Sequence, residues 1–160
     1  MSGPAPVELQ AEATAVASPP LHRMAVALLS LVGVLISTYL LLHKLGVVGT
    51  LMCGTGSCDT VQASPWAVFL GVPVPAWGVA GYGLLLGVSL AGLRPGMWES
   101  RRVGRVLLVL GAGAFGFSAY LTAIEAFVIH AWCRWCVASA VVATLIFIFT
   151  LGEVFRPGSR

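Results

Sequence analysis

The chain has 160 residues, of which 58% are hydrophobic and only 9% are charged. Soluble domains carry charge on about a quarter of their residues, so this composition excludes an ordinary soluble fold. The formal net charge of +3 is small and scattered along the sequence, which also argues against a nucleic-acid-binding surface.

The first stretch of the chain, 1–20, is rich in Ala, Pro, Ser and Glu and shows no apolar periodicity. This composition predicts a disordered cytoplasmic tail, and a second short cytoplasmic tail is expected over 156–160. The residues between them, 21–155, have a length that suits a single membrane domain.

Four uncharged stretches approach the roughly 20 residues that a helix needs to cross the hydrocarbon core of a bilayer. They are 24–42, 76–93, 106–124 and 135–152. Each is predicted to be a helix, because an open strand would leave backbone groups unpaired in lipid. The first is longer than the apolar region of a signal peptide, so we expect it to be retained. The predicted fold is an all-α membrane protein, a four-transmembrane-helix bundle.

Basic residues are divided unevenly between the two sides of this bundle. Of the nine Lys and Arg residues, Lys44 and Arg134 fall on one side. The other seven fall on the opposite side: Arg23, Arg94, Arg101, Arg102, Arg105, Arg156 and Arg160. The positive-inside rule therefore predicts a multi-pass inner-membrane protein with both termini in the cytoplasm. The connections 46–75 and 126–133 are then external.

The longer external connection begins with a glycine-rich loop and continues through 61–70, which is apolar enough to lie on the membrane surface. We expect this part to form a short lid helix between the first and second spans. The run Gly71-Val72-Pro73-Val74-Pro75 cannot continue a helix, because proline lacks an amide donor and restricts the residue before it. The second span is therefore predicted to start near Ala76.

All four cysteines fall at the external side. Cys53 and Cys58 form a Cys-x4-Cys loop, and Cys133 and Cys136 form Cys-Arg-Trp-Cys where the fourth span begins. Cysteines used only as small core residues would be scattered through the helices, and the external side is the oxidising one. Three interpretations remain: two static disulfides, a zinc site of four thiolates, or a thiol-disulfide relay. Only one Cys-x2-Cys pair is present, so no metal is expected and the relay is favoured.

The Cys-x-x-Cys pair carries the strongest chemical signal. A helix start places unpaired amides near the sulfur of Cys133, which lowers the pKa of its thiol, and Arg134 adds a positive charge beside it. Cys136 lies one turn deeper and is expected to face the interior of the bundle. Asp59, directly after Cys58, would raise the pKa of that thiol by repelling the thiolate.

Two further titratable residues, Glu125 and His130, lie in or beside the short connection between the third and fourth spans. A histidine such as His130 suits a proton relay, because imidazole can both accept and donate a proton. An ordinary interfacial loop residue is the alternative.

Several motifs in order resemble those of the vitamin K epoxide reductase family. They are the Cys-x4-Cys loop after the first span, Ser64 in Gln-Ala-Ser-Pro-Trp, a proline-rich start of the second span ending Ala-Trp-Gly, and Cys-x-x-Cys at the fourth span. The resemblance covers about 21–155. It implies a four-helix bundle around a quinone, with the external loop carrying a shuttle pair of cysteines.

The resemblance also implies a role for each cysteine. Cys136 is the thiol that contacts the quinone, and Cys133 is its disulfide partner. Cys58 is the shuttle cysteine that exchanges with Cys133, and Cys53 meets a protein substrate. Ser64 matches a Ser or Thr that the family places near the active site, although a Ser exposed in a turn is the alternative.

Tryptophans gather at the external interface, namely Trp66, Trp77, Trp132 and Trp135. Anchoring in the aromatic belt of the membrane is the default interpretation. Trp77 or Trp135 lining the quinone site is the second one.

Two positions depart from the animal enzymes of the family, which hold the quinone with an Asn and a Tyr where this chain has Val74 and Ala140. The chain instead resembles the bacterial branch, as a homologue without a fused thioredoxin-like domain. That branch passes electrons from a thioredoxin-like periplasmic oxidant, here expected to be a separate protein, to a membrane quinone such as menaquinone or ubiquinone. This activity supports disulfide bond formation.

Two alternatives to this function remain open. In quinone-linked oxidases of the disulfide bond formation B type, the Cys-x-x-Cys pair belongs to the first external loop, whereas here it belongs to the second. The other alternative is a non-enzymatic membrane scaffold stapled by disulfides.

Overall fold

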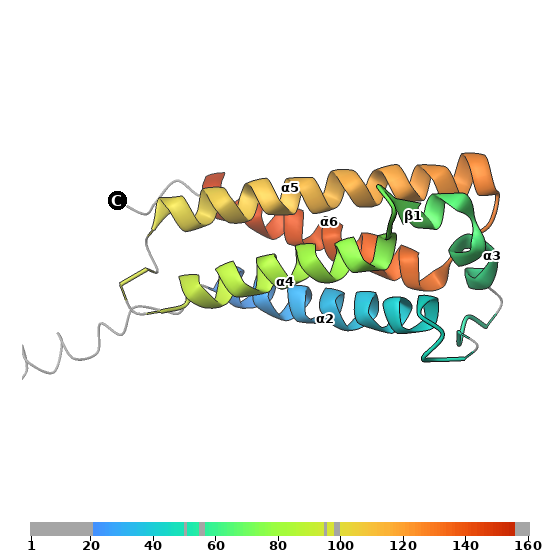
Figure 1. Cartoon of the computed structure of the whole chain (residues 1–160). Helices are drawn as coiled ribbons and strands as arrows, with labels where there is room; N and C mark the ends of the chain where they lie inside the picture. The colour runs from blue at the N-terminus through green and yellow to red at the C-terminus, as the bar shows by residue number, and fades with distance from the viewer. Residues whose placement is uncertain (1–20, 50, 55–56, 95, 98–99, 156–160) are drawn as a thin grey trace, which may run out of the picture.

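The computed structural model describes residues 21–49, 51–54, 57–94, 96–97 and 100–155, so the two predicted tails lie outside the described residues. Within them, four helices are long and apolar enough to cross a membrane. They are α2 (Leu21–Lys44), α4 (Val74–Gly92), α5 (Arg101–Ile124) and α6 (Arg134–Phe155), and they run side by side along one direction (Figure 1). The predicted four-helix membrane bundle is confirmed.

The centre of the bundle is packed with aliphatic side chains from all four helices. Val26, Leu85, Leu107 and Ile146 are almost completely buried. Large apolar side chains also cover the outside of the helices, with Leu28, Leu84, Val109 and Ile148 all more than half exposed. A helix that is apolar on every face is typical of a membrane span, because lipid replaces water around it.

Arg23 ties together the end of the bundle where α2 begins and α6 ends. Its Nη2 lies 2.7 Å from Oε1 of Glu153. The same guanidinium donates hydrogen bonds to the carbonyl oxygens of Gly92 at 3.0 Å, Met97 at 2.8 Å and Ser100 at 3.2 Å. From the sequence, Arg23 served only as one of the basic residues that indicate the cytoplasmic side. In the structure it is a buried residue that links α2 to α6 and to the α4–α5 connection.

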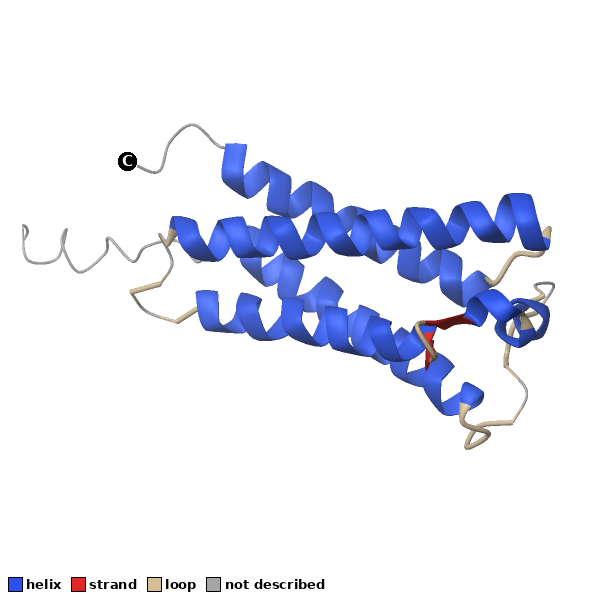
Figure 2. Cartoon of the chain, turned by 45° about the horizontal axis from the view of Figure 1, so that its top comes forward, coloured by secondary structure: helices blue, strands red, loops and turns tan. Residues whose placement is uncertain are grey.

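The opposite end carries all four cysteines and is called the cysteine end below. Here α3 (Cys58–Ala63) is followed by a 3-10 turn, η1 (Pro65–Ala67). Two short antiparallel strands come next, β1 (Val68–Phe69) and β2 (Val72–Pro73), shown in red in Figure 2. Residues 58–73 are called the lid. The short lid helix was predicted, but it begins at Cys58 instead of Val61, and the strands were not predicted.

Helix α4 begins two residues before the predicted start. Pro75 occupies one of its first two positions, where an amide donor is not needed and the fixed φ of proline suits a helix. The proline-rich run therefore starts the helix instead of delaying it.

The third span is longer than predicted. After α5 the chain continues as a π-helical turn, η2 (Glu125–Ile129), and then adopts a left-handed conformation at His130 with φ of 54°. The prediction that 126–133 is a loop is thus wrong, since only 130–133 connect the third span to α6. The extra turn shifts the side chains of this segment relative to a regular helix.

Close packing of α2 against α4 leads to the first testable prediction. A Cβ on Gly33 would lie 2.5 to 2.7 Å from ring atoms of Tyr82. We expect Gly33→Ala to displace this ring and to destabilise the bundle by about 1 to 3 kcal/mol, measured as a lower thermal unfolding temperature in detergent. Gly87→Ala on α4 is the matched control, because a Cβ there meets nothing within 4 Å. Equal loss in both variants would contradict this packing argument.

Candidate thiol-disulfide site

Cys53 and Cys58 form a disulfide in the loop at the cysteine end, with their Cα atoms 6.1 Å apart. Cys133 and Cys136 carry free thiols. The four cysteines are therefore in two different redox states. Within the described residues, no group of three or more His, Cys, Asp or Glu side chains is placed to hold a metal ion.

The loop disulfide and the free pair lie next to each other. The amide of Ser57 donates a hydrogen bond of 3.0 Å to the carbonyl oxygen of Trp132, so the residues that precede Cys58 and Cys133 are joined directly. Cys58 and Cys133 are both completely buried and belong to the same cluster of core side chains. The geometry brings together the two cysteines that the resemblance pairs for exchange.

Cys133 sits immediately before α6, where the first amides of the helix point toward its sulfur. The amide of Cys136 donates to Sγ of Cys133 at 3.3 Å. The pKa of the Cys133 thiol is lowered, chiefly by a hydrogen bond from the Cys136 thiol and further by the amides of Cys136 and Trp135, against the opposing effects of burial and of Glu125. This direction agrees with the prediction from the helix start.

Arg134 does not act as expected. Its side chain is exposed, and its Nη1 lies 2.7 Å from the position that a Cβ on Gly54 would occupy. The guanidinium therefore packs over the loop between Cys53 and Cys58, and hydrogen bonds take its expected place in lowering the pKa of Cys133.

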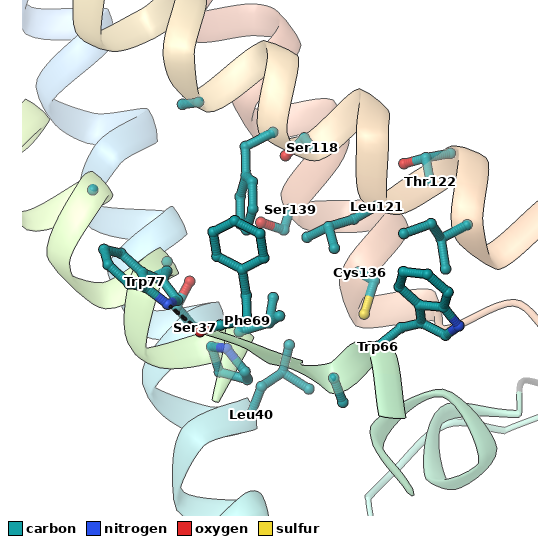
Figure 3. A pocket seen from close by; sticks show the side chains of 18 of the residues that line it. Ser37, Leu40, Trp66, Phe69, Trp77, Ser118, Leu121, Thr122, Cys136 and Ser139 are labelled. Atoms are coloured by element: carbon teal, nitrogen blue, oxygen red, sulfur yellow. Dashed lines mark hydrogen bonds between the residues drawn. The ribbon is translucent and has the colours of Figure 1, made fainter. Parts of the chain in front are cut away.

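A cavity of about 410 Å³ opens between the helices and the lid, directly beside the free pair. Its walls are mainly apolar and include all three residues expected at a quinone: Cys136, Ser64 and Trp77. The sulfur of Cys136 points into this space from α6, with Trp66 and Leu121 close by (Figure 3). The prediction that Cys136 faces the interior is confirmed.

The lid forms one wall of the cavity, and its aromatic side chains are held in place by contacts with the helices. Nε1 of Trp77 donates to the carbonyl oxygen of Phe69 at 3.2 Å, which joins α4 to β1 (Figure 3). The ring of Phe69 also packs edge-on against Phe117 of α5, with centroids 5.7 Å apart. Trp135 is not among the residues that line the cavity, and it packs against Tyr39 with centroids 5.0 Å apart.

Ser64 closes a turn and also lies in the wall of the cavity. Its Oγ donates to the carbonyl oxygen of Val61 at 2.7 Å, which closes the end of α3 as a turn serine would. The residue is also half-buried and lines the cavity.

A few polar groups interrupt the apolar walls of the cavity. The hydroxyl of Tyr82 donates to the carbonyl oxygen of Ser139 at 2.8 Å and lies 2.9 Å from its Oγ. Of the two positions that depart from the animal enzymes, Val74 lines the cavity, whereas Ala140 lies in a separate groove beside Phe127.

The lid is attached to the end of α2 by polar contacts. Nζ of Lys44 donates to the carbonyl oxygen of Gln62. Nε2 of His43 lies 3.4 Å from Oδ1 of Asp59. Asp59 therefore faces His43, and its expected effect on Cys58 does not arise here because that sulfur is in a disulfide.

Sequence reasoning missed the importance of Glu125, which it placed with His130 in or beside a loop. His130 is exposed, whereas Glu125 is 4% exposed and its Oε2 accepts a 3.2 Å hydrogen bond from the amide of Cys133. A signal was present, because an acidic residue at the end of an apolar span is costly and usually functional.

A four-helix membrane bundle with a loop disulfide beside a Cys-x-x-Cys pair at an apolar cavity is the architecture of a membrane thiol-disulfide oxidoreductase. The chain matches the model of the Vitamin K epoxide reductase family over residues 24–151, which is most of its length. It belongs to this family, and the resemblance found from the motifs is confirmed. Family membership implies an oxidoreductase activity.

Proposed function

We propose that this protein passes electrons from a periplasmic thioredoxin-like protein through its two cysteine pairs to a membrane quinone, and thereby supports disulfide bond formation. The observation that carries the proposal is the position of the free pair. Cys133 lies beside the loop disulfide, and Cys136, one helical turn away, opens into an apolar cavity. A two-ring or one-ring quinone suits such a cavity, because its walls are aromatic and aliphatic with few polar groups.

The first half of the reaction is thiol-disulfide exchange. A thiolate of the partner attacks Cys53, and the second partner thiol then resolves the mixed disulfide, which leaves Cys53 and Cys58 reduced and the partner oxidised. The Cys58 thiolate next attacks Cys133 of an oxidised Cys133–Cys136 pair. Attack of Cys53 on Cys58 restores the loop disulfide and leaves both Cys133 and Cys136 reduced.

The second half is reduction of the quinone by this free pair. Two electrons pass from the sulfurs of Cys133 and Cys136 to the quinone, which becomes a quinol, and the two sulfurs become a disulfide. The lowered pKa of the Cys133 thiol favours formation of the Cys133–Cys136 disulfide, because the Cys133 thiolate is the species that closes it. The state seen here, with an oxidised loop pair and a reduced inner pair, is the one that precedes quinone reduction.

Direct quinone reduction tests the proposal. The purified protein is reduced with dithiothreitol, freed of excess reductant and mixed with a short-chain benzoquinone. We expect about one quinone to be reduced per two thiols lost, followed by absorbance and by alkylation of the remaining thiols. A membrane scaffold stapled by disulfides would reduce none, and that result would overturn the proposal.

The proposed direction requires the cysteine end to face the periplasm and both termini to lie in the cytoplasm, as the distribution of basic residues indicates. A reporter enzyme fused after Arg101 should be active in the cytoplasm, and one fused in the loop between Cys53 and Cys58 should be active outside. An external signal at Arg101 would contradict this orientation.

A further inference from the structure

Glu125 is brought into the site by the π-helical turn at the end of the third span. The carbonyl oxygen of Glu125 accepts hydrogen bonds from the amides of His130 and Ala131, which closes the turn around the left-handed residue. Turns of this kind are rare and often occur at functional sites. Here the turn leaves the carboxyl side chain 4% exposed at the cysteine end.

Both cysteines of the free pair contact this carboxylate. Oε2 accepts the amide hydrogen of Cys133 at 3.2 Å, and the carboxylate lies close enough to the thiol of Cys136 to interact with it electrostatically. Glu125 lines the cavity into which the Cys136 sulfur opens. It therefore lies beside the reacting sulfur and borders the space that a substrate would occupy.

Among the described residues, no basic side chain forms an ion pair with this buried carboxylate. In the part of the chain that the structure describes, the ion pairs are Arg23–Glu153 and His43–Asp59, and neither includes Glu125. In the same part of the chain, the titratable groups that interact with it are the thiols of Cys133 and Cys136. A buried carboxylate without a positive partner is costly, so its retention beside two thiols calls for a chemical role.

We propose that the Glu125 carboxylate takes the proton of the Cys136 thiol and delivers it to an oxygen of the quinone. This inference rests on the function proposed above. Quinone reduction needs two electrons and two protons. The electrons come from the sulfurs of Cys133 and Cys136, which end as a disulfide. One proton travels from Cys136 through Glu125 to one quinone oxygen. Cys133 releases its proton to water, and water supplies the proton for the second oxygen.

A purely structural role for Glu125 would be to hold the amide of Cys133. Glutamine can do the same through its carbonyl oxygen, but it cannot accept a proton from a thiol. Glu125→Gln therefore separates the two roles. Glu125→Asp keeps a carboxylate on a shorter side chain.

The experiment follows the two half-reactions separately in the full-length protein. Glu125→Gln should slow reduction of a short-chain benzoquinone by about 100-fold in kcat with little change in KM, because general base catalysis contributes about this much without adding to binding. Reduction of the oxidised protein by dithiothreitol should stay within about twofold of wild type, since this step does not require Cys136 to lose a proton to Glu125.

The pH profile supplies a readout that a structural role would not change. In the wild type the quinone step should reach a plateau near neutral pH, because Glu125 accepts the proton. In Glu125→Gln the rate should rise steadily with pH and reach no plateau, because the Cys136 thiol must then lose its proton directly to solvent. Glu125→Asp should keep the plateau at a lower rate. If the Gln variant does not fold, loss of the plateau in Glu125→Asp would contradict the proton-accepting role.

Glu153→Gln is the matched control, because Glu153 is also shielded, with 18% of its side chain exposed, but lies at the other end of the bundle. It should lower the unfolding temperature and leave the quinone rate and plateau of the folded protein unchanged. A wild-type rate and plateau in Glu125→Gln, or the same kinetic defect in Glu153→Gln, would overturn this inference alone. A wild-type protein that reduces no quinone would overturn the proposed function as well.

Discussion

Cys136→Ala is expected to abolish quinone reduction, with a loss on the order of 10³-fold or more. Its sulfur is the one that opens into the cavity, and the buried Cys133 sulfur cannot replace it there. Loss of the reacting nucleophile generally removes nearly all catalysis, whereas loss of a neighbouring contact does not. The assay is single-turnover reduction of a short-chain benzoquinone by the dithiothreitol-treated protein. Mass spectrometry should show that the Cys53–Cys58 disulfide still forms.

Val137→Ala is the control, because this next residue of α6 is 38% exposed and is not among those that line the cavity. It should reduce quinone at close to the wild-type rate. Cys133→Ala should give a complementary result: it leaves the Cys136 thiolate without a partner, and a coloured thiolate–quinone band should appear on adding quinone. Addition of Cys136→Ala should remove the band. Quinone reduction retained in Cys136→Ala would reject the proposed mechanism.

Cys53→Ala is expected to lower quinone reduction much more with a protein donor of electrons than with a small dithiol. The variant has no loop disulfide for a thioredoxin-like protein to reduce, so quinone reduction with that donor should fall on the order of 100-fold or more. A membrane-permeant dithiol should still support much of the activity, since the cavity gives it a path to the inner pair that avoids the loop.

The comparison uses the same preparation with the two donors, and the wild type supplies the reference ratio of their rates. Cys53→Ala/Cys58→Ala tests whether the residual activity needs Cys58, and the small dithiol should support it equally well. Equal loss with both donors in the single variant would contradict the assignment of Cys53 as the cysteine that meets the protein partner.

The lengths and apolar composition of continuous stretches of the sequence were sufficient to predict the four spans and the lid helix. Span length and apolar composition are properties of a continuous stretch, and the membrane tolerates essentially one structure for such a stretch. The clustering of Cys53, Cys58, Cys133 and Cys136 at one end followed from the same argument, because each lies near the end of a span. The direction of the pKa shift at Cys133 was also predictable, since the Cys136 thiol that contributes most to it and the amides that add to it all belong to the start of the same helix.

Contacts between segments far apart in the chain decided the remaining features. In the sequence, Arg23 indicated only which side of the membrane is cytoplasmic. The packed bundle places it against Glu153 and three carbonyl groups. Arg134 was expected beside Cys133 and instead covers Gly54, because the loop disulfide brings that glycine close to the start of α6.

The lid and the π-helical turn show most clearly what the tertiary structure alone determines. Ser64 and Trp77 share a cavity with Cys136 only because β1 and β2 fold the lid back between the helices. Glu125 would lie in an ordinary helix end or loop by local preference. The turn closed at His130 and the hydrogen bond from Cys133 direct its carboxylate inward, and both depend on α6 being packed against α5. Sequence therefore determines which groups reach the cysteine end, and packing determines which of them meet.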